Sequence, residues 1–450
     1  MDLTIGASGI GETDRLRIVR VAVNVSGAES YTTTIDGAAL RSGDLHVQYI
    51  PGVSSGSLSF VVDALDSNGT AIANGMAEDV ALVPGDAVQV VLDLMSPLAD
   101  LGSSDLAIED GGVADLTVPI DLESAECAGT TVSTLAGNGT AGAIDGTGGP
   151  AGTTEFKGPL GIAVDNTGNV YVADSGNSRI RRVAPDGTTT TIALDQDSGT
   201  SDVFGASYVA VDAAGTLYIA DTYHHQIRKI PAGGVAVVLA GNGTAGFNDG
   251  PGGSAEFNFP AGVAVDGNGY VYVGDNTNNR IRKIATDGTT SSLAGNGTAG
   301  FADGSSGIAE FNAPAGVAVD SQGVVYVADY GNNRIRRVAP DGTTTTIAGN
   351  GTAGFKDGSG GANGTTMFKG PTAVDLYADG SMYVTDNANS RIRKILPDGT
   401  TTTIAGTSVG FADGNGCTSL FNQPAGIAGS GTTLFVTDAA SNRLRKIQIP

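Results

Sequence analysis

One sequence phrase occurs six times in this chain, and this repetition constrains the fold more than any other feature. The phrase runs from an apolar stretch through "YVAD" to "RIRR" or "RIRK". Its central aspartate recurs as Asp174, Asp221, Asp275, Asp329, Asp386 and Asp438, at spacings of 47, 54, 54, 57 and 52 residues. A period of this length indicates a unit that buries its apolar face against its neighbours, so we expect the copies to form one array.

Each copy reads as four short strands. In the third copy, "AGVAVD" (261–266) is followed by "YVYVGD", by "RIRKI" and by a strand that enters "LAGNGTAGF". Stretches rich in Val, Ile, Tyr and Thr, separated by Asn-Gly, Asp-Gly and Gly-Asn, are typical of antiparallel hairpins with positive-φ turns. Four antiparallel strands in each of six copies predict an all-β, six-bladed β-propeller over residues 127–450.

The two ends of the array complement each other. The last copy stops after its third strand, at "NRLRKIQIP", whereas residues 130–142 supply a fourth strand before the first full copy. We therefore expect strand 130–136 to complete the last blade and to remove an open sheet edge. Cys127 and Cys417 are then expected at opposite ends of this strand, about 20 Å apart at 3.3 Å per residue. A disulfide would require the loop 406–424 to run down the side of the blade.

The segment "GPLGIAVDNTGNVYVADSGNSRIRRV" (158–183) resembles the NHL repeat family of propellers, and the match recurs in all six copies, over about 70% of the chain. The resemblance implies the propeller fold. It implies no single activity, because members of this broad family include extracellular sensor and adhesion modules, RNA binders, and related lyases or hydrolases.

Residues 1–95 have a different pattern. Stretches such as "RLRIVRVAVNV" and "SLSFVVDALD" alternate as half-buried strands between polar turns. They predict an N-terminal β-sandwich domain of immunoglobulin or fibronectin-III type, although the cysteine and tryptophan signature is missing. Residues 96–126 contain eight acids and no base, which predicts an acidic linker in which "VADLTVPIDL" could add one strand.

Charge and composition narrow the partners and the compartment. The formal charge is -23, and 17 of the 24 basic residues lie in the six "RIRR"-type segments. Because carboxylates accompany these segments, we expect no nucleic-acid partner. No apolar run approaches the roughly 18 residues of a transmembrane segment. An acidic chain rich in Gly, Thr and Asn with two cysteines favours an extracellular, cell-surface or periplasmic location.

Two recurrent features are expected to support the scaffold. An Asp at the end of the second strand and an Arg at the start of the third are predicted to pair around the turn. These pairs are Asp174 with Arg179, Asp275 with Arg280, Asp329 with Arg334, Asp386 with Arg391, and Asp438 with Arg443. The "AGNGTAG" loops place Asn138, Asn242, Asn296 and Asn350 in register. Asn-Gly-Thr fits a glycosylation acceptor, but the recurrence favours a tight turn.

The second copy breaks the pattern. In "ADTYHHQIRKI" (220–230), Tyr223, His224 and His225 replace small residues, and Gln226 replaces the Arg. The loop that enters this copy takes 16 residues where regular copies take 23 to 25. Both segments are expected on one propeller face, as neighbours. The family resemblance implies that His225 stands at a usual histidine position, which leaves His224 as the unusual residue. We consider turn capping, ligand contact, and metal or catalytic use for these side chains.

The shortened loop also carries Asp195, Asp197 and Asp202 in "DQDSGTSD". Alternate oxygens with a glycine at the fifth position partly match a calcium-binding loop, although the third Asp and the terminal Glu are missing. The alternative interpretation is a short acidic surface loop. Calcium is therefore the one cofactor that the sequence suggests.

The sequence favours a non-enzymatic binding protein. The innermost strands, such as "GIAV" and "GVAV", offer little beyond small apolar groups to the channel, and we find no Ser-His-Asp set, phosphate loop or zinc spacing. We therefore expect an extracellular or cell-surface protein that binds a protein or glycan ligand on one loop face. Two alternatives stay open: a structural subunit of a surface fibre or coat that self-assembles through the N-terminal domain, and a metal-dependent lyase or hydrolase.

Overall fold

The chain divides into two compact units, residues 1–122 and 123–450. The computed structural model describes residues 127, 129–192, 205–377 and 379–450 in full, and the backbone of seven strands within residues 1–126. The predicted acidic linker, 96–126, lies outside the described residues. Within the described part of the chain, no helix is long and apolar enough to cross a membrane.

The described strands of the N-terminal unit form two sheets. One has the strand order β4-β1-β7, and the other has the order β3-β2-β5-β6. The strands are β1 (Asp2–Gly6), β2 (Arg20–Gly27), β3 (Tyr31–Asp36), β4 (Leu45–Gln48), β5 (Gly56–Leu65), β6 (Ala71–Leu82) and β7 (Val90–Asp93). β1 runs parallel to β7 and antiparallel to β4. How the two sheets pack depends on side chains outside the described set, so the β-sandwich and the domain boundaries stay predictions.

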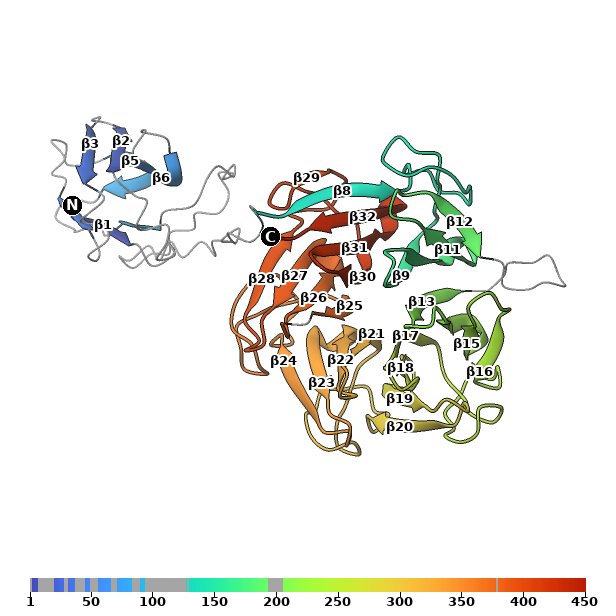
Figure 1. Ribbon diagram of the computed structural model, residues 1–450. Coiled ribbons are helices and arrows are strands. Elements are labelled where there is room, and N and C mark those ends of the chain that lie inside the picture. Colours follow the sequence, from blue (N-terminus) through green and yellow to red (C-terminus); the bar gives the residue numbers. More distant parts are fainter. Residues whose placement is uncertain are drawn as a thin grey trace. The chain divides into compact units, whose positions relative to one another are not determined.

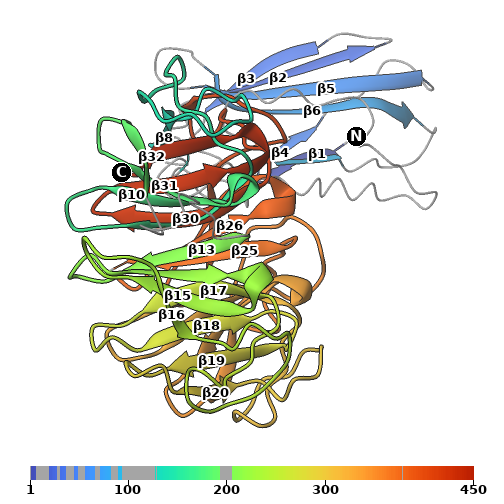
Figure 2. The ribbon, with the colours of Figure 1, turned by 90° about the vertical axis from the view of Figure 1, so that its right-hand side faces the viewer.

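The second unit is a six-bladed propeller, which confirms this part of the predicted fold class. Five blades are antiparallel sheets of four consecutive strands, the sixth has the order β29-β8-β32-β31-β30, and the blades follow one another around a central axis (Figure 1). A view turned by 90° shows the strands crossing the thickness of the ring (Figure 2). The innermost strands are β9 (Pro159–Val164), β13 (Ala206–Val211), β17 (Pro260–Val265), β21 (Pro314–Val319), β25 (Pro371–Leu376) and β30 (Pro424–Ser430).

The outer strands repeat with the same regularity. The second strands are β10 (Val170–Asp174), β14 (Leu217–Asp221), β18 (Val271–Asp275), β22 (Val325–Asp329), β26 (Met382–Asp386) and β31 (Thr433–Asp438). The third strands are β11 (Arg179–Val183), β15 (Gln226–Ile230), β19 (Arg280–Ile284), β23 (Arg334–Val338), β27 (Arg391–Ile395) and β32 (Arg443–Gln448). The fourth strands are β12 (Thr189–Ile192), β16 (Val237–Ala240), β20 (Thr290–Ala294), β24 (Thr344–Ala348), β28 (Thr401–Ala405) and β8 (Thr131–Ala136).

Strand β8 closes the ring as the sequence predicted. It is the fourth strand of blade six and pairs antiparallel with β32, from Gln448 opposite Thr131 to Leu444 opposite Ala136. The residues at the two ends of the repeat array therefore share one sheet. This arrangement leaves the sixth blade as complete as the other five.

The expected separation of the two cysteines was wrong, and the alternative path, with the loop along the side of the blade, is the one observed. Cys127 and Cys417 form a disulfide with their Cα atoms 5.1 Å apart. The loop 406–423 runs back along the outer edge of blade six, where β29 (Gly414–Asn415) pairs with the start of β8. Loops of other blades do the same, since Gly250 and Gly304 bridge to Thr290 and Thr344 on the neighbouring fourth strands. The sequence argument assumed that such loops stay at the ends of the blades.

The predicted Asp-Arg pairing was correct in kind but wrong in the arginine. Asp275 bonds to Arg282, two residues beyond Arg280, with 2.7 Å between the charged atoms. The buried guanidinium also bonds to Asp249 of the entering loop at 2.6 Å, and the other oxygen of Asp249 accepts the amide of Ser292 on the outer strand. The same three-residue network occurs in four other blades, around Arg181, Arg336, Arg393 and Arg445.

These five buried arginines lie in the cores of their blades. Arg282 is fully buried, and its guanidinium lies 4.9 Å from the ring centres of both Phe247 and Phe257. Arg280, which the sequence placed in the pair, lies nearer the surface and donates to the carbonyl oxygens of Gly295 and Asn296. Side chains that look like a positive stripe in the sequence are therefore largely neutralised by carboxylates and carbonyl groups inside the scaffold.

The "AGNGTAG" loops adopt the expected turn. Asn242 Oδ1 accepts the amide of Thr244 at 2.7 Å, and Gly243 has a φ of +87°. The same asparagine-to-threonine bond occurs at Asn138, Asn296 and Asn350. The turn accounts for the repeated Asn-Gly-Thr sequence.

Candidate functional site

The turn that breaks the repeat in blade two contains a short 3-10 helix, η2 (Thr222–His224), between β14 and β15. His224 Nδ1 lies 2.9 Å from the carboxylate oxygens of Asp221, which is fully buried. In four other blades, an asparagine at this position donates to the corresponding aspartate: Asn177, Asn278, Asn332 and Asn389. His224 therefore does the turn-capping work of these asparagines, and its use in ligand contact stays a prediction.

His225 connects blade two to blade three. It has a left-handed φ of 55°, and its Nδ1 accepts the amide of Phe259 at 3.2 Å. In blade three, Asn279 Oδ1 accepts the amide of Ala313 in the same way. Desolvation, followed by the nearby charge of His224, lowers the pKa of His225 below its ordinary value. The ring therefore stays neutral at neutral pH, which keeps Nδ1 able to accept the bond.

Tyr223, His225 and Phe259 form a cluster that we call the aromatic patch. Tyr223 is 66% exposed, and its ring meets that of Phe259 edge to face at 5.9 Å between centres. Phe259, 39% exposed, meets His225 in the same geometry at 4.9 Å. Other blades carry small residues in place of Tyr223, namely Gly176, Thr277, Gly331, Ala388 and Ala440. The patch is therefore specific to the junction of blades two and three.

Sequence reasoning missed Phe259. The residue has a φ of +52°, a left-handed backbone that an aromatic residue rarely adopts. Its counterparts in the other five blades are Gly158, Gly205, Ala313, Gly370 and Gln423. The signal was present in the sequence as "NFP", where the other copies have "KGP", "NAP" and "NQP".

Gln226 starts β15 where the other third strands start with arginine. Its Nε2 donates to the carbonyl oxygen of Gly241 at 3.3 Å, which retains part of the contact that Arg280 makes in blade three. Arg228 pairs with Asp221 at 2.6 Å, and its side chain is 25% exposed, whereas its five counterparts are fully buried. The arginine core is therefore more open in blade two than in the other blades.

The shortened loop lies beside the turn at the end that the structure describes. A Cβ atom on Gly205 would overlap the Tyr223 ring, so this end of the loop contacts the aromatic patch as expected. Asp195, Asp197 and Asp202 lie outside the described residues, and the calcium loop stays a prediction. Among the residues that are described, no group of three or more His, Cys, Asp or Glu side chains is placed to hold a metal ion.

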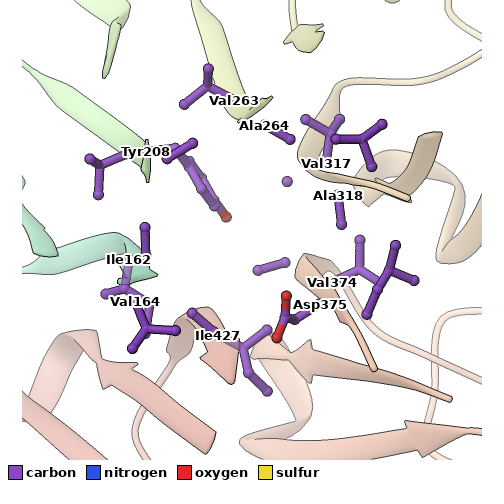
Figure 3. A pocket seen from close by; sticks show the side chains of 18 of the residues that line it. Ile162, Val164, Tyr208, Val263, Ala264, Val317, Ala318, Val374, Asp375 and Ile427 are labelled. Carbon is purple, nitrogen blue, oxygen red and sulfur yellow. The ribbon is translucent and has the colours of Figure 1, made fainter. Parts of the chain in front are cut away.

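A second concave site lies on the propeller axis. It is a cavity of about 250 Å³ lined by all six innermost strands (Figure 3). The third residue of the innermost strand is glycine or alanine in five blades and Tyr208 in blade two. The fifth residue of the same strand is alanine in five blades and Asp375 in blade five. Sequence reasoning described these strands as small and apolar and missed both residues, although "YVAV" and "TAVD" differ from "GVAV" there.

Burial shifts the pKa values of the two polar side chains that line the cavity. Burial raises the pKa of Asp375 to about 7, while the facing amides of Leu376 and Gly429 oppose this shift. Burial also raises the pKa of Tyr208, whose hydroxyl group donates to the carbonyl oxygen of Thr372 at 2.6 Å. At neutral pH, Asp375 therefore exists in both protonation states, whereas Tyr208 is neutral.

Two protein-family models match this chain. A model of the Teneurin NHL domain matches residues 129–306, and a model of the NHL repeat matches residues 311–338. Both matches fall within the propeller and support the NHL resemblance there. A curated relative, "Protein SUPPRESSOR OF QUENCHING 1, chloroplastic" of Arabidopsis thaliana, is 38% identical over 94 residues, which are 20% of this chain and 9% of that protein. The chain therefore spans a small part of that relative's length.

Comparison with solved structures gave matches that cover nearly the whole chain. An auxiliary nutrient binding protein from Bacteroides thetaiotaomicron VPI-5482 is 15% identical, with a TM-score of 0.55, over 95% of this chain and 90% of its own. A protein of the same description from Bacteroides ovatus ATCC 8483 is 14% identical, with a TM-score of 0.55, over 96% and 95%. At these identities the likeness shows the fold alone.

Proposed function

We propose that this chain is a ligand-binding protein that acts at the cell surface, in the periplasm or outside the cell, and that it binds a protein or glycan ligand through the aromatic patch. The observation that carries the proposal is the exposure of Tyr223 and Phe259 where the other blades have mostly small residues. Rigid, amphipathic aromatic side chains supply a large contact area at low entropic cost, and they concentrate at binding hot spots.

Two further observations support the location and the binding role. The Cys127–Cys417 disulfide is a type of bond that persists in oxidising compartments and is rare in the cytosol. The two Bacteroides proteins with the same fold are described as auxiliary nutrient binding proteins. These points favour capture of an extracellular ligand over an intracellular role.

The proposal is tested by removing the aromatic rings one at a time. Phe259→Ala places in blade three the residue that blade four carries with the same backbone, Ala313 at φ 51°. Tyr223→Ala likewise imitates Ala388 and Ala440 of other blades. Both variants should therefore fold, and each should weaken binding about tenfold or more.

The assay is a glycan array, together with immobilised candidate protein ligands, probed with purified protein. Tyr330→Ala is the matched control, because Tyr330 is 44% exposed on the equivalent turn of blade four. Equal binding by the wild type and both patch variants would remove the aromatic patch as the binding site.

A further inference from the structure

Tyr208 and Asp375 face the axial cavity from opposite sides of the ring. The innermost strands contact one another in the cyclic order β9, β13, β17, β21, β25 and β30, so β13 and β25 are three blades apart. Tyr208 belongs to β13, and its hydroxyl group reaches Thr372 on β25. One side chain therefore spans the axis near the end where the innermost strands begin.

Apart from Tyr208 and Asp375, the side chains that line the space beyond the Tyr208 ring are apolar, although backbone and side chains together expose more polar than apolar surface there. The walls of this space come from the third to sixth positions of the innermost strands, mainly Val, Ile and Ala. Asp375 is the only charged side chain among the described residues that line this cavity. Figure 3 shows the Tyr208 ring and the Asp375 carboxylate both projecting into the same space.

We propose that the axial cavity binds a small organic ammonium ion, with Asp375 as its counter-ion and the Tyr208 ring as an aromatic wall. A carboxylate bonds to an ammonium group through short charge-assisted hydrogen bonds. An aromatic face attracts the same cation through its quadrupole, and more strongly where water is excluded. The apolar walls fit the hydrocarbon part of such a ligand.

Other classes of ligand fit the cavity less well. An anion would meet the Asp375 carboxylate inside a protein of net charge -23. A calcium ion needs six to eight oxygen ligands, whereas the lining side chains offer one carboxylate and one hydroxyl group that already donates to Thr372. A neutral apolar molecule would remove water from the Asp375 carboxylate and add no partner to the amides of Leu376 and Gly429.

The volume limits the size of the ligand. An apolar cavity of about 150 Å³ holds one benzene molecule. At about 250 Å³, this cavity has room for a primary amine with a short branched or cyclic body and not for an oligosaccharide or a peptide. The ligand class therefore differs from that proposed for the aromatic patch.

The protonation of Asp375 gives the proposal a second readout. A bound ammonium ion favours the carboxylate form, so binding near pH 7 should release protons from the protein. Tyr208 and Tyr377 are titratable groups near Asp375, and both stay neutral because burial raises their pKa values, which the Asp375 charge raises further for Tyr377. Proton release should therefore come from Asp375 alone.

The cavity and the aromatic patch can be tested separately. None of the three residues of the aromatic patch lines the cavity, so each site can fail without the other. Calorimetric titration of the full chain with isobutylammonium chloride should show saturable one-to-one binding, and isobutanol should bind about tenfold more weakly or worse. The binding heat at pH 7 should change with the ionisation enthalpy of the buffer.

Asp375→Asn keeps the shape of the side chain and removes its charge. This variant should lose affinity for isobutylammonium about tenfold or more and should lose the buffer dependence. Asp341→Asn is the control, because it makes the same charge change at an exposed turn of blade four and should leave binding unchanged. Equal affinity of wild type and Asp375→Asn, or no saturable binding at about 10 mM probe, would overturn the proposal.

Discussion

Breaking the Cys127–Cys417 bond measures how much this crosslink contributes to closure of the propeller. The bond joins positions 290 residues apart and ties the start of β8 to the loop beside it. Without the bond, β8 keeps its ladder with β32, and Gly416 still donates its amide to the carbonyl oxygen of Thr130 at 2.8 Å. The native fold should therefore form, with a lower free energy of unfolding.

The size of the loss follows from the length of chain that the bond closes. In the chain-entropy treatment, a loop of 290 residues corresponds to about 6 kcal/mol at 25 °C. Measured losses for native disulfides are about 2–5 kcal/mol. We therefore expect the free energy of unfolding to fall by about 3–6 kcal/mol.

The assay compares guanidinium unfolding of the wild type with that of Cys417→Ser, Cys127→Ser and the double variant. Cys417→Ser is the cleaner single change, because Cys127 is 2% exposed and a serine there would bury a hydroxyl group. Cys417→Ser should lose the contribution of the bond, whereas Cys127→Ser and the double variant should lose this contribution and the cost of the buried hydroxyl group. Wild-type protein unfolded with a reductant should match Cys417→Ser.

Two results would refute this reasoning. One is two titratable thiols in wild-type protein that was denatured without reductant. The other is a wild type that differs from Cys417→Ser by less than about 1 kcal/mol, which would mean that the denatured chain gains little freedom when the bond is lost.

Two further predictions test the core and the junction of blades two and three. Arg336→Met removes a fully buried guanidinium that bonds two carboxylates, and chemical denaturation should show a loss of about 3–5 kcal/mol in the free energy of unfolding. Arg228→Met changes a side chain that is 25% exposed and should lose clearly less. Equal losses would contradict the difference between the blades. Because the folded-state pKa of His225 is lowered, its contribution to stability should be complete above about pH 6.5 and be lost as the pH falls below that value. His225→Asn should reduce this pH dependence between pH 8 and 5, and an unchanged profile would show that His225 does not titrate on unfolding.

The repeat made the propeller and its closure predictable, because both depend on local strand patterns and on the number of strands in each copy. Four strands per copy, and the half copy at each end, required only the alternation of residues and the turn signals. The roles of His224 and His225 were also partly accessible, since their positions could be compared with the asparagines of the other copies.

The errors came from the loops. The sequence places Arg280 directly opposite Asp275, and the structure pairs these two positions across the ladder, yet the side-chain bond goes to Arg282. The loop that carries Asp249 runs along the edge of the blade and bonds the same guanidinium. A path of this kind depends on how a long loop packs against a finished sheet, and strand periodicity contains no information on it.

By itself, the sequence determined the number of blades, the strand order within each blade and the exceptional character of copy two. Only the tertiary structure brought Cys417 to Cys127, Phe259 to Tyr223, and Tyr208 across the axis to the strand that carries Asp375. The physical reason is distance along the chain. Repeat periodicity describes contacts within a copy and with its neighbour, whereas the axial cavity is formed by blades that meet only once the ring has closed.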